Sequence, residues 1–483
     1  MTFYSLEFLI FFVIVFVLYY FAFKERTKVQ NALLLVASYV FYAWANWKVL
    51  PLLMLATAVF YGLGIALSKA KTDKRKSLFT VSGVVFGICL LLYFKYFNFF
   101  ISSFKDLFEM LGMQTNLHTF NIILPIGISF YTFRLLSYII DIQRGKIEPT
   151  HNILDFAVYV AFFPCILAGP IDRPAAMMPQ LQRKRIFDYS LAVNGMRQIL
   201  WGLFIKVVVA DNCAVYVNQA FDNYQQQTGS TLLLGAIFYS FQLYADFSGY
   251  SDMAIGVAKM FGFRITRNFD YPFFSQNIAE YWRKWHISLT SWLSDYVFMP
   301  LNIKWRDWGV WGTIIAILIT FVLIGLWHGD NWKFAFFGLY HGLLYIPLIL
   351  TGIMFKKSKI ETYKWGFPKP KILFNILLTF GLATLGNIIF RADSLSIAFE
   401  YMGKILNVRS LFIMPAEKAL ILKNISVVAC MLFVEWIGRK DQFGLEKLGI
   451  KWQPVFRYAM YYAILLLIFL SMGKEQIFIY FQF

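Results

Sequence analysis

Long runs of apolar residues, most of them with few charged side chains, constrain the fold of this chain more than any other feature. Each run is long enough to cross the roughly 30 Å hydrocarbon core of a bilayer as an α-helix rising about 1.5 Å per residue. We predict about eleven to twelve such spans, which lie near 4–23, 30–47, 50–68, 78–100, 121–140, 191–211, 231–258, 311–328, 332–354, 372–390, 419–437 and 455–472. A membrane β-barrel would instead show alternating segments of about ten residues. The sequence therefore predicts an all-α, polytopic membrane protein.

Composition agrees with a membrane protein and excludes several other classes. Hydrophobic residues make up 59% of the 483 positions and charged residues 15%, whereas soluble proteins carry about 25% charged residues. The four cysteines are scattered, without the spacing of a metal or redox site. A disordered chain, a collagen and a disulfide scaffold are thereby excluded.

Positive charge gathers between the apolar runs and predicts how the chain lies in the membrane. The formal net charge is +18, and Lys and Arg concentrate in cytoplasmic loops, where they also meet anionic lipid. We therefore place residues 69–76 and 356–371 in the cytoplasm, and alternation then puts both termini outside it. No nucleic-acid partner is expected, because no aromatic–basic binding module is visible. Residues 8–23 are predicted to be a retained span, since no basic residue precedes them.

Two segments between the spans have patterns of their own. Residues 153–169 are apolar but contain Pro164, which favours a re-entrant or interfacial element over a full crossing. Residues 275–301 repeat apolar and aromatic side chains at three- and four-residue steps, which predicts an amphipathic helix on the cytoplasmic membrane surface with Arg283 and Lys284 towards water. Asn277 followed by Glu280 three residues later resembles the start signal of that helix.

Two of the five histidines lie where a titratable side chain needs an explanation. His328 ends the apolar run 311–328, and His286 lies on the apolar face of the segment 275–301. A histidine with a pKa near 6.5 can take a proton from a hydroxyl at neutral pH, so His328 is a candidate general base. The alternative is a histidine that hydrogen-bonds a neighbouring helix and only stabilises packing.

Other chemistry-bearing residues are few. Asp246 and Asp252 lie in apolar surroundings, where they could orient a histidine, pair with a basic residue or line a polar tunnel. A metal site is not expected, because no HxxxH or CxxC spacing occurs, and no nucleophile elbow, P-loop or GxGxxG motif is present. Cys165 is a possible thioester carrier, but buried apolar cysteines are usually inert. A membrane transferase and a transporter both fit these residues.

Motifs that keep a fixed order make the prediction specific. The chain resembles the membrane-bound O-acyltransferase (MBOAT) family, and within it the AlgI branch of alginate O-acetylation. The matching stretches are ISFYTFRLLSYIIDIQRGK (128–146), FFPCILAGPIDRPAAMMPQL (162–181), IKVVVADN (205–212), YADFSGYSDMAIG (244–256), NFDYPFFSQNIAEYWRKWHISLTSWLSDYVFMPL (268–301) and GLWHG (325–329). They fill a core of residues 120–345 within a chain expected to form one domain, 1–483.

The resemblance implies a fold and a set of site residues. Helices would ring a thin central region crossed by a tunnel. The two histidines characteristic of the family fall on His286 and His328, and His328 is the one carried as catalytic. Asp246, Trp285 and Trp327 are predicted to line the tunnel.

The resemblance also implies a reaction. An acyl group, most simply acetyl, would pass from acetyl-CoA or an acyl carrier protein in the cytoplasm across the bacterial inner membrane. An SGNH-hydrolase-like O-acetyltransferase would complete its delivery to an extracytoplasmic polysaccharide. No permanently bound cofactor is expected. D-alanyl transfer of the related DltB branch is an alternative, and a polysaccharide or lipid transporter using Asp246 and Asp252 as an ion relay is an alternative from another class.

Residues 478–483 (FIYFQF) also resemble a motif of such systems, in which one tyrosine carries the acyl group outward. That tyrosine would be Tyr480. The alternative is an aromatic anchor at the membrane interface. We predict that Tyr480 is a relay.

Overall fold

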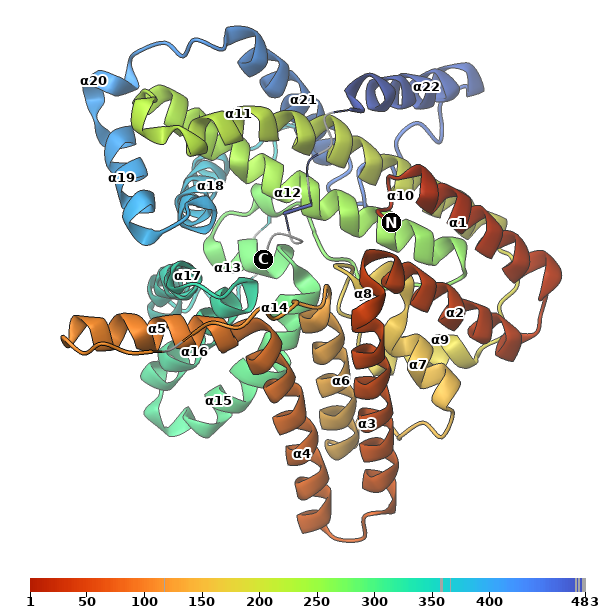
Figure 1. Cartoon of the computed structure of the whole chain (residues 1–483). Coiled ribbons are helices and arrows are strands. Elements are labelled where there is room, and N and C mark those ends of the chain that lie inside the picture. Colours follow the sequence, from red (N-terminus) through yellow and green to blue (C-terminus); the bar gives the residue numbers. More distant parts are fainter. Residues whose placement is uncertain (117, 357–358, 365, 474–475, 477, 480–483) are drawn as a thin grey trace. The chain divides into compact units, whose positions relative to one another are not determined.

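The computed structural model describes residues 1–116, 118–356, 359–364, 366–473, 476 and 478–479. Within those residues the regular elements are helices, with one isolated bridge between Thr362 and Pro368 (Figure 1). The all-α prediction is confirmed. Contacts divide the chain into two compact units, Met1–Met196 with Ala254–Thr266 and Arg197–Met253 with Arg267–Phe483. The single domain 1–483 stays a prediction.

The first unit contains a packed group of three helices. Its elements are α1 Leu6–Val17, η1 Leu18–Ala22, α2 Thr27–Asn46, η2 Trp47–Val49, α3 Leu50–Lys69, α4 Asp73–Leu91, η3 Leu92–Tyr96, α5 Phe97–Met110, α6 Ile128–Gln143, α7 Ile153–Ala161, α8 Phe163–Ile166 and α9 Pro174–Gln182. Helices α3, α4 and α6 lie side by side (Figure 1). A Cβ atom on Gly64 would lie 2.7 Å from the ring of Tyr138, and one on Gly87 would lie 2.9 Å from Leu136. These glycines therefore let the helices approach closely.

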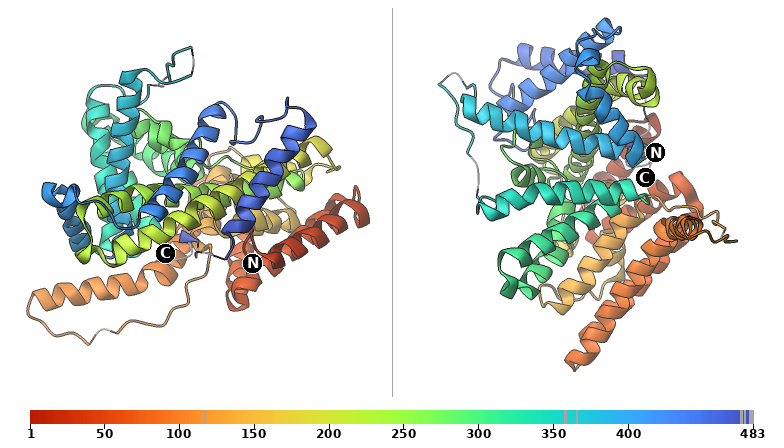
Figure 2. Two further views of the ribbon diagram at one scale, coloured as in Figure 1. Left: turned by 90° about the horizontal axis from the view of Figure 1, so that it is seen from above. Right: turned by 90° about the vertical axis from the view of Figure 1, so that its left-hand side faces the viewer.

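Helices α10, Tyr189–Leu203, and α12, Gly229–Met260, belong partly to each unit. The other elements of the second unit are η4 Phe204–Ala210, α11 Asp211–Asp222, η5 Tyr224–Gln226, η6 Pro272–Phe274, α13 Ile278–Lys284, α14 Ile287–Leu293, η7 Ser294–Phe298, α15 Met299–Lys304, η8 Arg306–Trp308, α16 Val310–His328, α17 Trp332–Leu350, α18 Pro370–Arg391, α19 Leu395–Leu406, α20 Val408–Leu411, α21 Lys418–Ile437 and α22 Pro454–Ser471. Helices α16 and α17 run side by side (Figure 2). A methyl group on Gly325 or Gly338 would collide with the backbone of the opposite helix, so this pair depends on glycine at both positions.

Eight helical segments in the described part of the chain are long and apolar enough to cross a membrane. They are Thr27–Lys69, Asp73–Met110, Tyr189–Asp222, Val310–His328, Trp332–Leu350, Pro370–Arg391, Lys418–Ile437 and Pro454–Ser471. The predicted number was larger because spans 30–47 and 50–68 fall in one segment interrupted at η2, span 4–23 is the shorter helix Leu6–Ala22, and span 231–258, which lies within α12, is not among the eight. Span 121–140 becomes helical only at Ile128. A multi-pass membrane protein is confirmed.

The element predicted over 153–169 is interrupted, as its proline suggests. Helices α7 and α8 meet at Phe162, and Pro164 lies in the first turn of α8. Neither helix is long enough to cross a bilayer alone at about 1.5 Å per residue.

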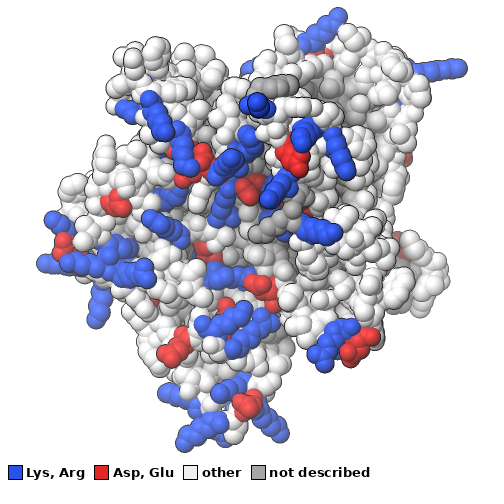
Figure 3. Space-filling model, turned by 180° about the vertical axis from the view of Figure 1, so that it is seen from behind, with Lys and Arg blue, Asp and Glu red and all other residues white. Residues whose placement is uncertain are grey.

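Lys and Arg outnumber Asp and Glu on the face shown in Figure 3, in keeping with the net charge of +18 (Figure 3). The assignment of 69–76 and 356–371 to the cytoplasm stays a prediction.

Candidate functional site

The segment predicted as one amphipathic helix over 275–301 is broken at His286. Helix α13 ends at Lys284 and α14 begins at Ile287, and His286 between them has a left-handed backbone with a φ of 44°. A non-glycine residue in such a conformation costs about 1–3 kcal/mol and persists only where its surroundings impose it. The continuous helix is therefore corrected to α13 before the break and α14, η7 and α15 after it. Side-chain periodicity could not predict the break, because a single left-handed residue leaves the pattern almost unchanged.

The predicted start of this segment is confirmed. Asn277 Oδ1 accepts a hydrogen bond from the backbone N–H of Glu280 at 2.8 Å, as an N-cap does. The Glu280 carboxylate accepts from the N–H of Gln276 at 3.0 Å and pairs with Lys284 at 2.8 Å. Arg283 is exposed, as expected, whereas Lys284 is half-buried.

The side chain of Asn268 fixes which nitrogen of His286 carries the proton. Asn268 Oδ1 accepts hydrogen bonds from the backbone N–H of Ser288 at 3.3 Å and from its hydroxyl at 2.9 Å, and it lies 3.1 Å from Nδ1 of His286. Because an amide oxygen only accepts, Nδ1 must be the protonated nitrogen. Nε2 of His286 is then the acceptor nitrogen.

Burial keeps that tautomer neutral. The His286 side chain is fully buried, and burial lowers its pKa well below the usual value, with the nearby charge of His328 lowering it further. Burial acts in this direction because a low-dielectric environment disfavours the charged imidazolium. His286 is therefore a hydrogen-bond acceptor at neutral pH.

The two predicted histidines are brought together through one indole ring. The Trp327 ring centroid lies 5.6 Å from that of His286 and 5.0 Å from that of His328. His328 is the last residue of α16 and is buried at 4% exposure. We call His286, Trp327 and His328 the histidine row.

Asp246 belongs to a buried ionic cluster. Lys206 Nζ lies 2.7 Å from a carboxylate oxygen of Asp246 and 2.7 Å from one of Asp211. The three side chains are 1–3% exposed. Of the roles that the sequence left open for Asp246, pairing with a basic residue is the one observed. Lys206 and Asp211 were missed as site residues, because they lie far from Asp246 in the sequence and no local pattern links the three.

The segment just before Tyr480 packs against this cluster and the histidine row. The backbone N–H of Ile479 donates to Asp246 at 2.8 Å. The Phe478 ring lies 6.1 Å from that of Phe247, and Phe247 lies 4.6 Å from the ring of His286. Tyr480 itself lies outside the described residues. Phe478 and Ile479 thus extend the row towards the predicted relay.

Trp285 has a different environment from Trp327. Its ring centroid lies 5.1 Å from Phe269 and 5.5 Å from Tyr281, within a buried aromatic cluster. Two cavities of the second unit, described next, are lined by other residues than Asp246, Trp285 and Trp327. The tunnel-lining role of these three residues stays a prediction.

An apolar cavity of about 360 Å³ lies along α13 and α14 where they face α16 and α17. Trp282, Phe321 and Tyr345 contribute aromatic walls, and Ser291 and Ser294 contribute hydroxyls. Such a volume, mostly apolar with a few polar groups, suits a small organic ligand.

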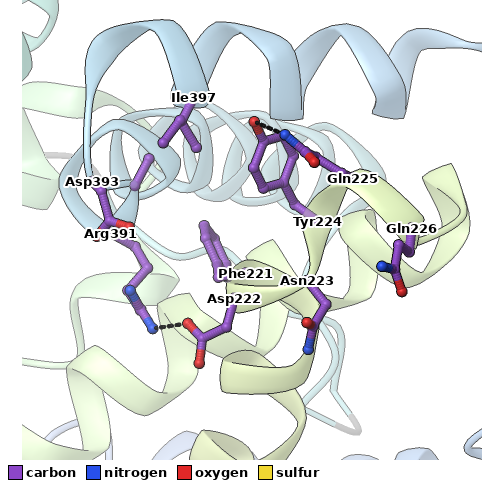
Figure 4. Close-up of a pocket in the computed structure, with 10 residues that line it drawn as sticks. Phe221, Asp222, Asn223, Tyr224, Gln225, Gln226, Arg391, Asp393 and Ile397 are labelled. Atoms are coloured by element: carbon purple, nitrogen blue, oxygen red, sulfur yellow. Dashed lines mark hydrogen bonds and ion pairs between the residues drawn. The ribbon is translucent and has the colours of Figure 1, made fainter.

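A second, more polar cavity of about 410 Å³ lies where α11 and α18 end. Arg391 points across it to Asp222, with 3.0 Å between Nη2 and Oδ1 (Figure 4). Phe390, the preceding residue of α18, lies 5.2 Å from the ring of His328. The cavity is therefore near the end of α16 that carries the predicted base.

The remaining candidates have structural surroundings. His341 is buried among rings, 5.0 Å from Trp282 and 4.7 Å from Phe337. Asp252 accepts a hydrogen bond from Gln198 at 2.7 Å. Burial raises the pKa of the Cys165 thiol to about 12, which disfavours the reactive thiolate. Among residues whose placement is described, no three His, Cys, Asp or Glu gather as metal ligands would.

Comparison with known proteins decides between transport and transfer. The model of the membrane-bound O-acyltransferase family matches residues 40–388. The chain belongs to this family. The match contains His286 and His328, and it makes the chain an acyltransferase, which leaves the transporter alternative without support.

Individual relatives agree with the membership. The chain is 40% identical over 403 residues to the probable alginate O-acetylase AlgI of Pseudomonas aeruginosa, covering 83% of this chain and 74% of the relative. It is 33% identical to that of Pseudomonas putida over the whole of both chains. It is 32% identical over 408 residues to the peptidoglycan O-acetyltransferase of Helicobacter pylori, covering 79% of this chain and 74% of the relative.

Proposed function

We propose that this acyltransferase moves an acetyl group from acetyl-CoA in the cytoplasm across the bacterial inner membrane for O-acetylation of an extracytoplasmic polysaccharide. The observation that carries the proposal is the continuity of the histidine row with Phe247 and Phe478, two residues before Tyr480. Relatives named as alginate and peptidoglycan O-acetylases support acetyl as the group and a polysaccharide as the acceptor.

The donor side is supported by the apolar cavity along α13 and α14. It lies along the segment that we predict to face the cytoplasm, and its serine hydroxyls suit the amide-bearing arm of a thioester donor. His286 accepts through Nε2, so it would hold an amide N–H of that arm next to the thioester. A carrier-protein thioester has the same arm and is the alternative donor.

The transfer step uses His328 as the base. A phenol has a pKa near 10 and is a weak nucleophile until its proton is removed. His328 takes the hydroxyl proton of Tyr480, the phenolate oxygen attacks the thioester carbonyl carbon, and the carbon–sulfur bond breaks. The departing CoA thiolate takes the proton back from His328. The products are an acetylated Tyr480 and CoA.

Delivery then needs a second enzyme. An aryl acetate is an activated ester, so the serine of an SGNH-hydrolase-like transferase would attack it and regenerate the Tyr480 hydroxyl. That enzyme would pass the acetyl group to a sugar hydroxyl of the polysaccharide. In this arrangement both termini of the chain lie outside the cytoplasm, and residues 69–76 and 356–371 lie within it.

The direct test is acetyl loading of the purified protein in liposomes. With labelled acetyl-CoA, we expect label on the peptide that contains Tyr480 in the wild type and none in His328→Ala. His341→Ala is the matched control, because it also removes a buried, ring-packed histidine of the second unit. Loading in His328→Ala equal to the control would overturn the assignment of the base. Loading from D-alanyl carrier protein alone would assign the chain to D-alanyl transfer.

A further inference from the structure

The ionic cluster of Lys206, Asp211 and Asp246 contacts two backbone groups of the segment 476–479. Asp246 accepts from the N–H of Ile479 at 2.8 Å, and Lys206 donates to the carbonyl oxygen of Gln476 at 3.3 Å. We infer that this cluster is a clamp that fixes the backbone of Gln476 and Ile479, the latter directly preceding Tyr480 in the sequence, and that acyl transfer depends on it. The inference rests on the proposed function for its purpose, while the clamp itself rests on these contacts.

Hydrogen bonding explains why the cluster would hold a backbone segment. The ammonium of Lys206 and the carboxylates of Asp211 and Asp246 are almost fully buried together. Buried carboxylates need hydrogen-bond donors, and the Ile479 N–H supplies one to Asp246. The ammonium has three donors, and Asp211, Asp246 and the Gln476 carbonyl match that number.

The local backbone is built to form this cluster. Lys206 lies in η4, a π-helix, in which hydrogen bonds run between residues five apart. Asp211 is five residues after Lys206, so the π-helical turn places the two side chains on one face. In an α-helix, at 3.6 residues per turn, a residue five positions on points elsewhere. Short π-helical segments often occur at functional sites.

Glycines bring η4 against α12, which carries Asp246. A Cβ atom on Gly249 would lie 2.7 Å from the carbonyl oxygen of Gly202 and 3.1 Å from the Cβ of Lys206. Tyr250, four residues after Asp246 on the same face of α12, stacks on Phe478 at 4.6 Å between ring centroids. Polar contacts to the backbone of Gln476 and Ile479, together with the ring contacts of Phe478 to Phe247 and Tyr250, thus hold these residues along η4 and α12.

A neighbouring buried pair shows what an ordinary structural contact looks like here. Tyr244 lies two residues before Asp246 and donates to Glu435 at 2.7 Å. Both partners of this pair are buried in helices of the body, α12 and α21. Glu435 therefore offers a matched control for changes in the clamp.

The first experiment removes one hydrogen bond of the clamp, from the Ile479 N–H to Asp246, and leaves the charged side chains unchanged. Ile479→Pro has no backbone N–H to donate to Asp246, whereas Ile479→Val keeps it. We expect the rate constant for acetyl loading of Tyr480 to fall at least tenfold in the proline variant, with the KM for acetyl-CoA unchanged. The valine variant should load like the wild type. A proline variant that loads normally, or one altered only in KM, would overturn the clamp.

The second experiment measures how accessible residue 479 is to a thiol reagent, and it needs no enzyme activity. Ile479→Cys is placed in a chain whose exposed Cys89 and Cys430 are serine, and its labelling by a maleimide is timed. Because residue 479 is buried at 5% exposure, labelling should be slow. Adding Lys206→Met should accelerate it at least tenfold, and adding Glu435→Gln should not.

The two experiments separate failure of the clamp from failure of the relay. If Tyr480→Phe still transfers acetyl groups but Lys206→Met releases the labelled cysteine, the clamp stands and the relay is wrong. If labelling is equally fast in all three backgrounds, the clamp is wrong whatever the activity shows. Lys206→Arg, which keeps the charge, should restore slow labelling at least in part, and its failure with normally folded protein would also count against the clamp.

Discussion

Each of the two compact units buries a cluster of charged side chains, and the clusters differ in what they hold. In the first unit, Arg134 is 1% exposed and donates to the carbonyl oxygen of Tyr159 at 2.9 Å. Asp172 accepts from the N–H of Thr266 at 2.9 Å, and burial raises its pKa against the opposing effect of Arg134. These partners all lie in loops and helices of the same unit, so the cluster connects elements within the first unit and stabilises its fold.

The Lys206 cluster of the second unit holds a segment adjacent to a candidate nucleophile and close to the histidine row. Burial of charge is therefore not the feature that marks the site, since both units have it. The difference lies in the group that is held. We expect damage to the first cluster to lower stability with little effect on the rate per folded molecule, and damage to the histidine row to lower that rate by far more than any loss of stability explains.

The largest expected effect separates the two regions by activity. His328→Ala removes the proposed base, and general bases contribute about 10²–10⁴-fold to rate. Acetyl transfer should fall by about that factor, while the melting temperature in detergent falls no further than in His341→Ala, which also removes a buried, ring-packed histidine. Tyr480→Phe should also block transfer to polysaccharide with normal expression, measured as O-acetyl release from the purified polymer. Normal O-acetylation in Tyr480→Phe would reduce residues 478–483 to an interfacial anchor.

The second prediction tests the opposite side of the comparison. Arg134→Met removes a buried guanidinium that donates to the carbonyl oxygen of Tyr159 at 2.9 Å and lowers the pKa of Asp172, and losing hydrogen bonds made by a charged group costs about 1.5–3 kcal/mol. We expect a marked loss of folded protein and a lower melting temperature. The surviving protein should transfer acetyl groups at a normal rate per folded molecule. A selective loss of rate with unchanged stability would place the first cluster in the chemistry.

The third prediction concerns pH. The folded state keeps His286 neutral, while the unfolded state takes up a proton below about pH 6.5. The unfolded state then binds more protons, so the free energy of unfolding should fall as pH drops below about 6.5, by about 1.4 kcal/mol per unit for this group. Above that pH the group contributes no slope. Replacing it in His286→Gln should remove this part of the slope, and an unchanged slope would contradict the assigned neutral state.

The smallest effect is expected at Cys165. Its thiol is buried and its raised pKa keeps it protonated, so a carrier role is disfavoured. Cys165→Ala should retain acetyl loading within about twofold, because a buried, protonated thiol supplies no nucleophile. Loss of loading with a normal melting temperature would revive the thioester carrier.

The sequence identified the parts of the site that lie within continuous motifs. His286 and His328 each lie in a short characteristic stretch, and the structure joins them through Trp327. Asn268, which sets the tautomer of His286, lies eighteen residues away, and no local pattern distinguishes it from another buried amide. Lys206 pairs with Asp211 through a π-helical turn and with Asp246 through a tertiary contact, and neither leaves a periodic signal in the sequence. Helix positions followed from hydropathy, whereas the break at His286 did not.

The left-handed backbone of His286 has a consequence for engineering. Glycine adopts that conformation at no steric cost, so His286→Gly would relieve the backbone. The same change would empty the space of a fully buried ring, and deleting a large side chain from a packed interior costs about 2–5 kcal/mol, as much as or more than the strain. Position 286 therefore cannot be stabilised by relieving its backbone alone, and a thermostable variant of this enzyme has to be sought elsewhere in the chain.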